Sequence, residues 1–138
     1  MIKEFIEKWD KYKNDLEKFF STTKQLEYST YDDIVKALFE HVINKDVEYG
    51  EYDTENILVI DDGNYQGTQI FILHKNMYQP GVEDYVYTNT YYGSCSGCDT
   101  LQAIQSWDYE KLPSKEQVKD YMELALHLLQ RIKIMSED

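Results

Sequence analysis

Hydrophobic residues recur every three to four positions in three stretches of the chain, and this period predicts three amphipathic helices. The first stretch covers about residues 2–20, the second follows Ser29 and Thr30, and the third follows Pro113. The apolar positions are Ile2, Phe5, Ile6, Trp9, Tyr12, Leu16, Phe19 and Phe20; Ile34, Val35, Leu38, Phe39 and Val42; and Val118, Tyr121, Met122, Ala125, Leu128, Leu129 and Ile132. We expect these side chains to face a common core.

The residues that open the second and third stretches are typical of helix starts. Asp32 and Asp33 lie in a first turn, where the helix dipole favours acidic side chains. Ser114 and Gln117 have the spacing of a capping box.

The middle of the chain has the pattern of strands. Residues 57–60 and 70–73 are short apolar runs rich in β-branched residues, and the turn formers of 61–67 separate them, which predicts a hairpin with a longish loop. The alternating pattern of residues 84–92 predicts a third strand, and we expect a short strand within 47–52. In the third strand, alternation places one set of side chains on one face and the other set opposite: Tyr85, Tyr87, Asn89 and Tyr91 against Val86, Thr88, Thr90 and Tyr92.

Contiguous strands between terminal helices predict an α+β fold. We expect an antiparallel sheet of three to four strands with the three main helices packed on one face. A length of 138 residues and the lack of repeats or linkers favour a single domain over residues 1–138.

The net charge of −12 is concentrated in the middle of the chain. Residues 46–110 hold twelve acidic residues and one base, Lys75, and therefore carry −11 of the total. Such a field disfavours direct nucleic-acid binding, which requires Lys and Arg to neutralise phosphates. It suits a basic protein partner or a cation, but a surface that only keeps the protein in solution is the commoner meaning of such a field. No apolar run is long enough for a membrane span and no signal-peptide pattern is present, so we expect a cytoplasmic protein.

The only two cysteines, Cys95 and Cys98, form a Cys-x-x-Cys pair where the third strand leads into a short helix around 101–105. Three interpretations are open. A redox pair is disfavoured because no parallel strand follows the motif and Asp99 opposes a thiolate. A zinc site needs four ligands, so His41, His74, His127, Asp99 or a second subunit would have to complete it. The favoured interpretation is a structural turn with small buried cysteines, in which Gly93 or Gly97 has positive φ and Ser96 or Asp99 caps the helix.

Three motifs in order resemble a group of small uncharacterised proteins of phages and prophages. They are DDGNYQG at 61–67, YGSCSGCDTLQ at 92–102 and DYMELALHL at 120–128, within a likeness that covers roughly residues 55–133. The resemblance implies a viral origin and a setting in the host cytoplasm. The resemblance implies no particular activity, so the function has to be inferred from the residues themselves.

No motif predicts catalysis, and we expect no enzyme and no cofactor, with zinc as the one alternative. Asp61 and Asp62 are adjacent and should point to opposite sides, which is a poor geometry for a shared proton or metal. No nucleophile elbow, Walker lysine or calcium-loop order is present. The 13 tyrosines are unusual, and tyrosine is favoured at protein interfaces. An alternative role for them is cross-strand pairing within the sheet.

These features favour a phage-encoded, non-enzymatic binding protein. Its acidic, tyrosine-rich surface would engage a basic site of a host protein, as an inhibitor or an anti-defence decoy. The residues expected on this surface are Tyr85, Tyr87, Tyr91, Asp61, Asp62 and Tyr65. The alternative is a small-molecule, nucleotide or metal-binding module centred on the turn at 93–98 and the loop at 61–67.

Overall fold

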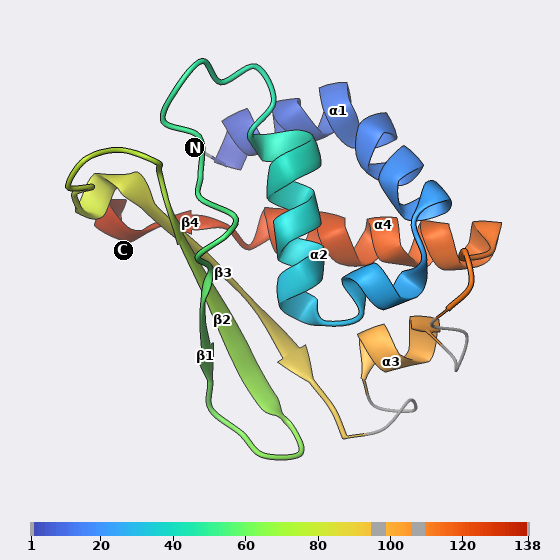
Figure 1. Ribbon diagram of the computed structural model, residues 1–138. Helices are drawn as coiled ribbons and strands as arrows, with labels where there is room; N and C mark the ends of the chain where they lie inside the picture. Colours follow the sequence, from blue (N-terminus) through green and yellow to red (C-terminus); the bar gives the residue numbers. More distant parts are fainter. Residues whose placement is uncertain (1, 95–98, 106–109, 138) are drawn as a thin grey trace.

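The fold is known from a computed structural model that describes residues 2–94, 99–105 and 110–137. Over these residues it has four α-helices and one four-stranded antiparallel sheet, so the predicted α+β class is confirmed (Figure 1). The helices are α1 (Ile2–Thr22), α2 (Tyr31–Leu38), α3 (Thr100–Gln105) and α4 (Lys115–Gln130). The strands are β1 (Leu58–Asp61), β2 (Gly67–His74), β3 (Tyr85–Tyr92) and β4 (Lys133–Ile134). A π-helical turn at Phe39–Ile43 extends α2.

Each strand of the sheet pairs with the next one along the chain, in the order β1-β2-β3-β4, and α3 and α4 lie in the connection between β3 and β4. Ile72 lies opposite Leu58 on one side and Tyr87 on the other, and Tyr87 lies opposite Lys133 of β4. These four residues therefore form one row across the same face of the sheet.

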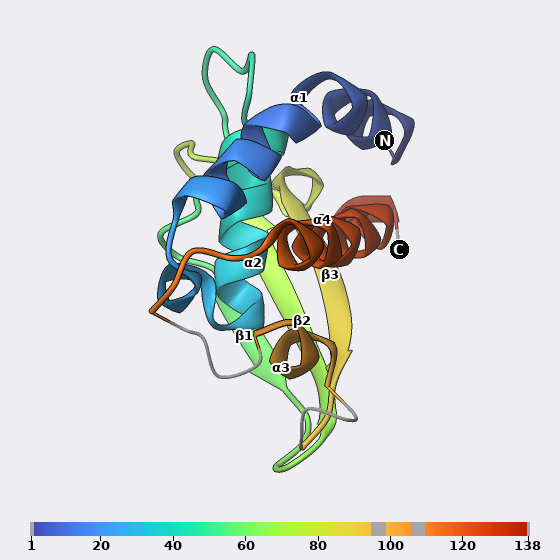
Figure 2. The same cartoon turned by 90° about the vertical axis from the view of Figure 1, so that its right-hand side faces the viewer.

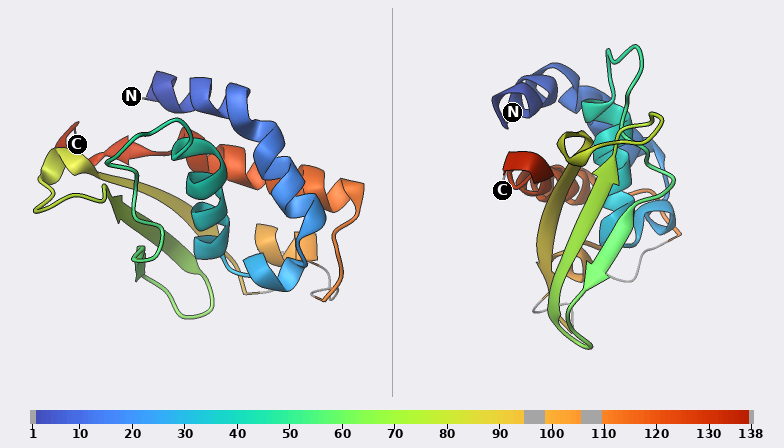
Figure 3. Two further views of the ribbon diagram at one scale, coloured as in Figure 1. Left: turned by 45° about the horizontal axis from the view of Figure 1, so that its top comes forward. Right: turned by 90° about the vertical axis from the view of Figure 1, so that its left-hand side faces the viewer.

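The helices cover the other face of the sheet over β2 and β3, whereas all four residues of the edge strand β1 are exposed. Figure 2 looks from the helix side, and the right-hand view of Figure 3 shows the sheet in front of the helices. Phe71, Leu73, Val86 and Thr88 point toward the helices and are buried. The hydroxyl of Thr88 donates a hydrogen bond of 2.7 Å to the Leu128 carbonyl oxygen, which joins β3 to α4. One packed face was predicted, and the burial pattern confirms it.

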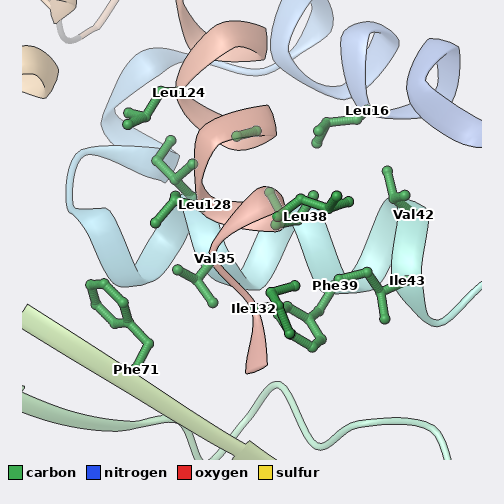
Figure 4. Packing of buried hydrophobic residues seen from close by; sticks show 14 of the residues in the cluster. Leu16, Val35, Leu38, Phe39, Val42, Ile43, Phe71, Leu124, Leu128 and Ile132 are labelled. Carbon is green, nitrogen blue, oxygen red and sulfur yellow. The ribbon is translucent and has the colours of Figure 1, made fainter. Parts of the chain in front are cut away.

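The core lies between α2, α4, α1 and the sheet. Figure 4 shows Leu16, Leu38, Phe39, Leu128 and Phe71 converging from these elements. The predicted apolar positions of the second stretch are all fully buried, as expected for a helix between two others. Beside them, the rings of Phe20, Tyr28 and Tyr121 contact one another, with centroid separations of 4.9 to 5.3 Å.

Three sequence expectations about the elements were wrong. The expected strand within 47–52 is absent: Tyr52 makes only an isolated bridge with Lys75, and the fourth strand is β4. Ile2 and Ile6 of α1 are exposed, because the buried face of this helix runs through Phe5, Trp9, Leu16 and Phe20. Ile132 is buried but follows the end of α4, where the chain turns into β4.

Candidate functional site

The hairpin loop at 61–67 is built by its two aspartates. Asp61 accepts a hydrogen bond of 2.9 Å from the Gly63 amide, and Asp62 accepts one of 2.7 Å from the Thr68 amide. The two carboxylates therefore fix different parts of the loop and do not form a pair, as expected from their adjacency. The loop is tight: a Cβ added to Gly63 would lie 1.9 Å from the Gln66 carbonyl oxygen.

Asp61 also joins this hairpin to the end of β3. The Tyr92 hydroxyl donates to the Asp61 carboxylate at 2.5 Å, and the Gln69 amide donates to it at 3.2 Å. The bond from Tyr92 is the main cause that lowers the pKa of Asp61, with the Gly63 amide second. The same bond raises the pKa of Tyr92 to about 12, so at neutral pH the tyrosine is the donor and the aspartate is ionised.

Asp99 organises the segment that follows β3. Its buried carboxylate accepts hydrogen bonds from the Tyr31 hydroxyl at 2.7 Å, the Gly93 amide at 3.0 Å and the Gln102 amide at 3.1 Å. The bond from Gln102 makes Asp99 the cap of α3, one of the two expected caps. Tyr31 in turn accepts from the Leu101 amide at 3.1 Å, and burial raises the pKa of its hydroxyl. A buried network thus ties the start of α2 to the start of α3.

The hairpin loop, the end of β3 and the starts of α2 and α3 surround a pocket of about 450 Å³. It lies on the helix side of the sheet, because Gln69 and Tyr92 point toward the helices. Tyr65 of the loop lines it with an exposed ring, and Asp99 and Tyr31 form its inner wall. The loop at 61–67 and the residues after β3 were expected to make one site, and Asn64, Tyr65, Gly93 and Ser94 do line the same pocket.

The structure separates the other candidate residues from this pocket. Tyr85, Tyr87 and Tyr91 lie on the open face of the sheet, as the alternation predicted, whereas Asp61 and Tyr65 lie toward the helix side. The expected surface is therefore not a single patch. An aromatic cross-strand contact joins His74 to Tyr85, with ring centroids 5.5 Å apart.

Aliphatic residues that the sequence reasoning did not single out lie beside these tyrosines. In the register of the sheet, Leu58 and Ile60 of β1 and Ile70 and Ile72 of β2 share the open face with Tyr87 and Tyr91. Leu58 is 56% exposed, Ile60 is 45% exposed and Tyr91 is 58% exposed. The signal was present as two continuous apolar runs, but such runs do not show which alternate residues are left uncovered.

Some of the acidic side chains form hydrogen bonds or ion pairs within the fold. Asp84 and Asp99 are buried and accept backbone hydrogen bonds, while Asp46 pairs with Lys11 and Glu55 with Lys36. Other acids stay exposed at the two ends of the sheet. Asp62 lies at the hairpin end, and Glu51 and Glu83 lie beside the end where β2 stops and β3 begins.

Cys95 and Cys98 lie outside the described residues, so the choice between turn, redox pair and zinc ligand stays a prediction. Positive φ was expected at Gly93 or Gly97, and Gly97 lies outside the described residues, so this expectation stays a prediction; among the described glycines the conformation occurs at Gly50. Within the described ranges, no three His, Cys, Asp or Glu side chains come together as a metal site requires. His41 stacks on Phe19, with ring centroids 4.6 Å apart, and His127 is exposed.

Comparisons with protein-family models, with curated proteins and with solved structures found no match to this chain. The likeness to phage and prophage proteins therefore stays a prediction. In the described ranges, no helix combines the length and the apolar character needed to cross a bilayer.

Proposed function

We propose that this chain is a non-enzymatic binding protein, encoded by a phage, that engages a basic site on a protein of the host cell. The observation that carries the proposal is the open face of the sheet. We call this surface the open sheet face and define it by six residues: Leu58, Ile60, Ile70, Ile72, Tyr87 and Tyr91.

The open sheet face has the composition of an interface centre. Contiguous exposed apolar side chains are uncommon on monomers and mark interaction surfaces. Leu58 and Ile60 belong to an edge strand that pairs, in the described part of the chain, with β2 alone. Tyr91 adds a rigid ring whose hydroxyl tolerates partial burial. A partner that covers this face would remove apolar surface from water, and this drives association.

Charge at the ends of the open sheet face selects the partner. Exposed acids lie beyond both ends of the strands, and Lys75 is the single base in residues 46–110. An interface with an apolar centre and a charged rim fits a partner of opposite charge, because complementary rims speed association and exclude wrong partners. Two bases lie at the β4 edge of the face, so the acidic rim is uneven: Lys133 of β4, and Arg131, whose guanidinium donates a hydrogen bond of 3.2 Å to the Asn89 carbonyl oxygen of β3.

The phage-like motifs support a partner from the host cell. A protein that covers a basic groove of a host defence or replication factor would act as a decoy or an inhibitor. Such a role needs no catalytic group.

A tagged copy expressed in the host tests the proposal. We expect one specific host protein to be recovered, and direct binding of the two purified proteins to weaken as salt increases. Leu58→Ala should reduce the affinity at least tenfold. Leu112→Ala is the matched control, because Leu112 is 55% exposed but precedes α4, away from the sheet.

Three outcomes would contradict the proposal. One is that no host protein binds the purified chain. The second is binding that is equal for Leu58→Ala and the parent. The third is an affinity that does not change with salt, because it would remove the role of the acidic rim.

A further inference from the structure

The pocket between the hairpin loop and α3 contains a polar group that the fold leaves unsatisfied. Gln105 ends α3 and lines the pocket, and it is 2% exposed. Its side-chain amide nitrogen has no hydrogen-bond partner. Burial of an unpaired amide is unfavourable, and the large majority of buried polar groups in native proteins have a hydrogen-bond partner.

The wall around Gln105 is held in place without a ligand. Asp99 has three donors, and the Tyr31 hydroxyl is both a donor and an acceptor. The hydroxyl of Tyr92 is committed to Asp61. These groups do not need to reorganise when something enters, so the pocket is preorganised.

The charge of the pocket restricts what can enter it. Its described lining includes the carboxylates of Asp32 and Asp99 and contains no Lys, Arg or His. Asp61 lies one hydrogen bond away, behind Tyr92. A phosphate would face like charges with no base to neutralise it, so nucleotides are disfavoured.

The remaining groups favour an uncharged polar ring. Amide side chains of Asn64, Gln102 and Gln105 line the pocket and can donate and accept hydrogen bonds. The ring of Tyr65 is 81% exposed at the rim, where it can cover the flat face of a ligand. A volume of about 450 Å³ is within the usual range for small-molecule sites.

We infer that this pocket binds an uncharged, polar, ring-shaped small molecule of the nucleoside or monosaccharide kind, and that an acceptor of this ligand pairs with the Gln105 amide. The site is separate from the open sheet face, since Tyr91 and Tyr92 point to opposite sides of the sheet. The inference therefore does not depend on the proposed function.

Ligand-detected NMR with the full chain tests the inference. The probes are four nucleosides (adenosine, guanosine, cytidine and uridine), two monosaccharides (glucose and galactose) and adenosine 5′-monophosphate. We expect at least one uncharged probe to bind, and the set that binds distinguishes the two sources. If adenosine is among them, its monophosphate should bind at least tenfold more weakly.

Two variants with matched controls locate the binding. Gln105→Leu and Tyr65→Ala should each weaken binding of the uncharged probe at least tenfold. Gln130→Leu, on the exposed end of α4, and Tyr78→Ala, at an exposed position between β2 and β3, should leave it unchanged. Circular dichroism of each variant confirms that the fold is intact.

The inference is overturned if none of the six uncharged probes binds, or if the monophosphate binds as well as its nucleoside. It is also overturned if folded Gln105→Leu binds the probe as tightly as the parent does.

Discussion

The Tyr92 hydroxyl lies 2.5 Å from the Asp61 carboxylate and joins the last residue of β3 to the last residue of β1. The two strands do not pair with each other, because β2 lies between them. The contact therefore links the two outer of these three strands at the end of the sheet where the pocket lies. Tyr91, which precedes Tyr92 in the chain, points to the opposite side and belongs to the open sheet face.

We expect Tyr92→Phe to raise the pKa of Asp61 toward its ordinary value, because the lost bond is the main cause of the lowering. The Gly63 and Gln69 amides still donate, so the pKa should stay somewhat low. Carboxylate NMR during an acid titration measures both values. Tyr91→Phe is the control on the opposite face and should leave the pKa of Asp61 unchanged.

The same contact predicts how stability depends on pH. A carboxylate whose pKa is lower in the folded than in the unfolded state stabilises the fold above the unfolded pKa. This contribution disappears as pH falls through the lowered pKa of Asp61. The difference in unfolding free energy between the parent and Tyr92→Phe should therefore shrink in acid. A difference that stays constant down to the lowest pH would show that the bond does not favour the ionised carboxylate.

The three main helices α1, α2 and α4 were predictable because each has a strong apolar period and, for α2 and α4, a start signal. β4 was not, because Ile132 continues the apolar period of α4 and the two residues of β4 follow it directly. Lys133 and Ile134 form a strand only because they pair with the edge of β3, where Val86 lies opposite Ile134 and Tyr87 opposite Lys133. A two-residue strand has no local signal of its own.

The site was predictable only where a local sequence pattern determines it. Alternation along β3 showed which tyrosines share a face. The pocket depends on contacts that no local pattern contains: Tyr31 and Asp99 are 68 positions apart in the chain. An unpaired amide such as that of Gln105 is visible only when all its neighbours are known.

Gly63→Ala should destabilise the hairpin loop and disturb the pocket. The new Cβ would lie 1.9 Å from the Gln66 carbonyl oxygen and 3.1 Å from the Gly67 Cα atom, so the backbone must move. Overpacking of this kind typically costs about 1–3 kcal/mol. Urea unfolding measures the loss.

Gly81→Ala is the control for that substitution. Its Cβ would first meet the Glu83 carboxylate, the flexible end of a side chain, so the neighbour can rotate away. We expect a much smaller loss of stability. Equal losses for the two variants would mean that the close approach at Gly63 is relieved at no cost.

His41 should make the protein less stable as pH falls below about 6.5, the ordinary pKa of histidine. Desolvation by burial lowers its pKa in the folded state, so the unfolded state binds the proton first. Stability is complete above the unfolded pKa and decreases as pH falls toward the lowered one. His41→Gln should lack this part of the pH dependence in urea unfolding at a series of pH values. Phe19→Ala, which exposes the ring, should raise the pKa of His41, as measured by NMR.

Two buried glutamines should respond in opposite ways to the same substitution. Gln25 is fully buried and its side-chain oxygen accepts a hydrogen bond of 2.7 Å from the Tyr121 hydroxyl, whereas the Gln105 amide nitrogen has no partner. Gln25→Leu leaves a buried hydroxyl without this acceptor and should cost about 1–3 kcal/mol. Gln105→Leu removes an unpaired donor and should leave the unfolding free energy unchanged or increase it.

Urea unfolding of the two variants beside the parent measures the contrast. A loss at Gln105 as large as that at Gln25 would show that the fold itself uses the Gln105 amide, which would leave no group for a ligand to satisfy. Gln130→Leu, exposed on α4, sets the baseline for the change from glutamine to leucine. If the Gln105 amide serves a ligand and not the fold, Gln105→Leu should keep the stability of the parent and lose binding of the probe.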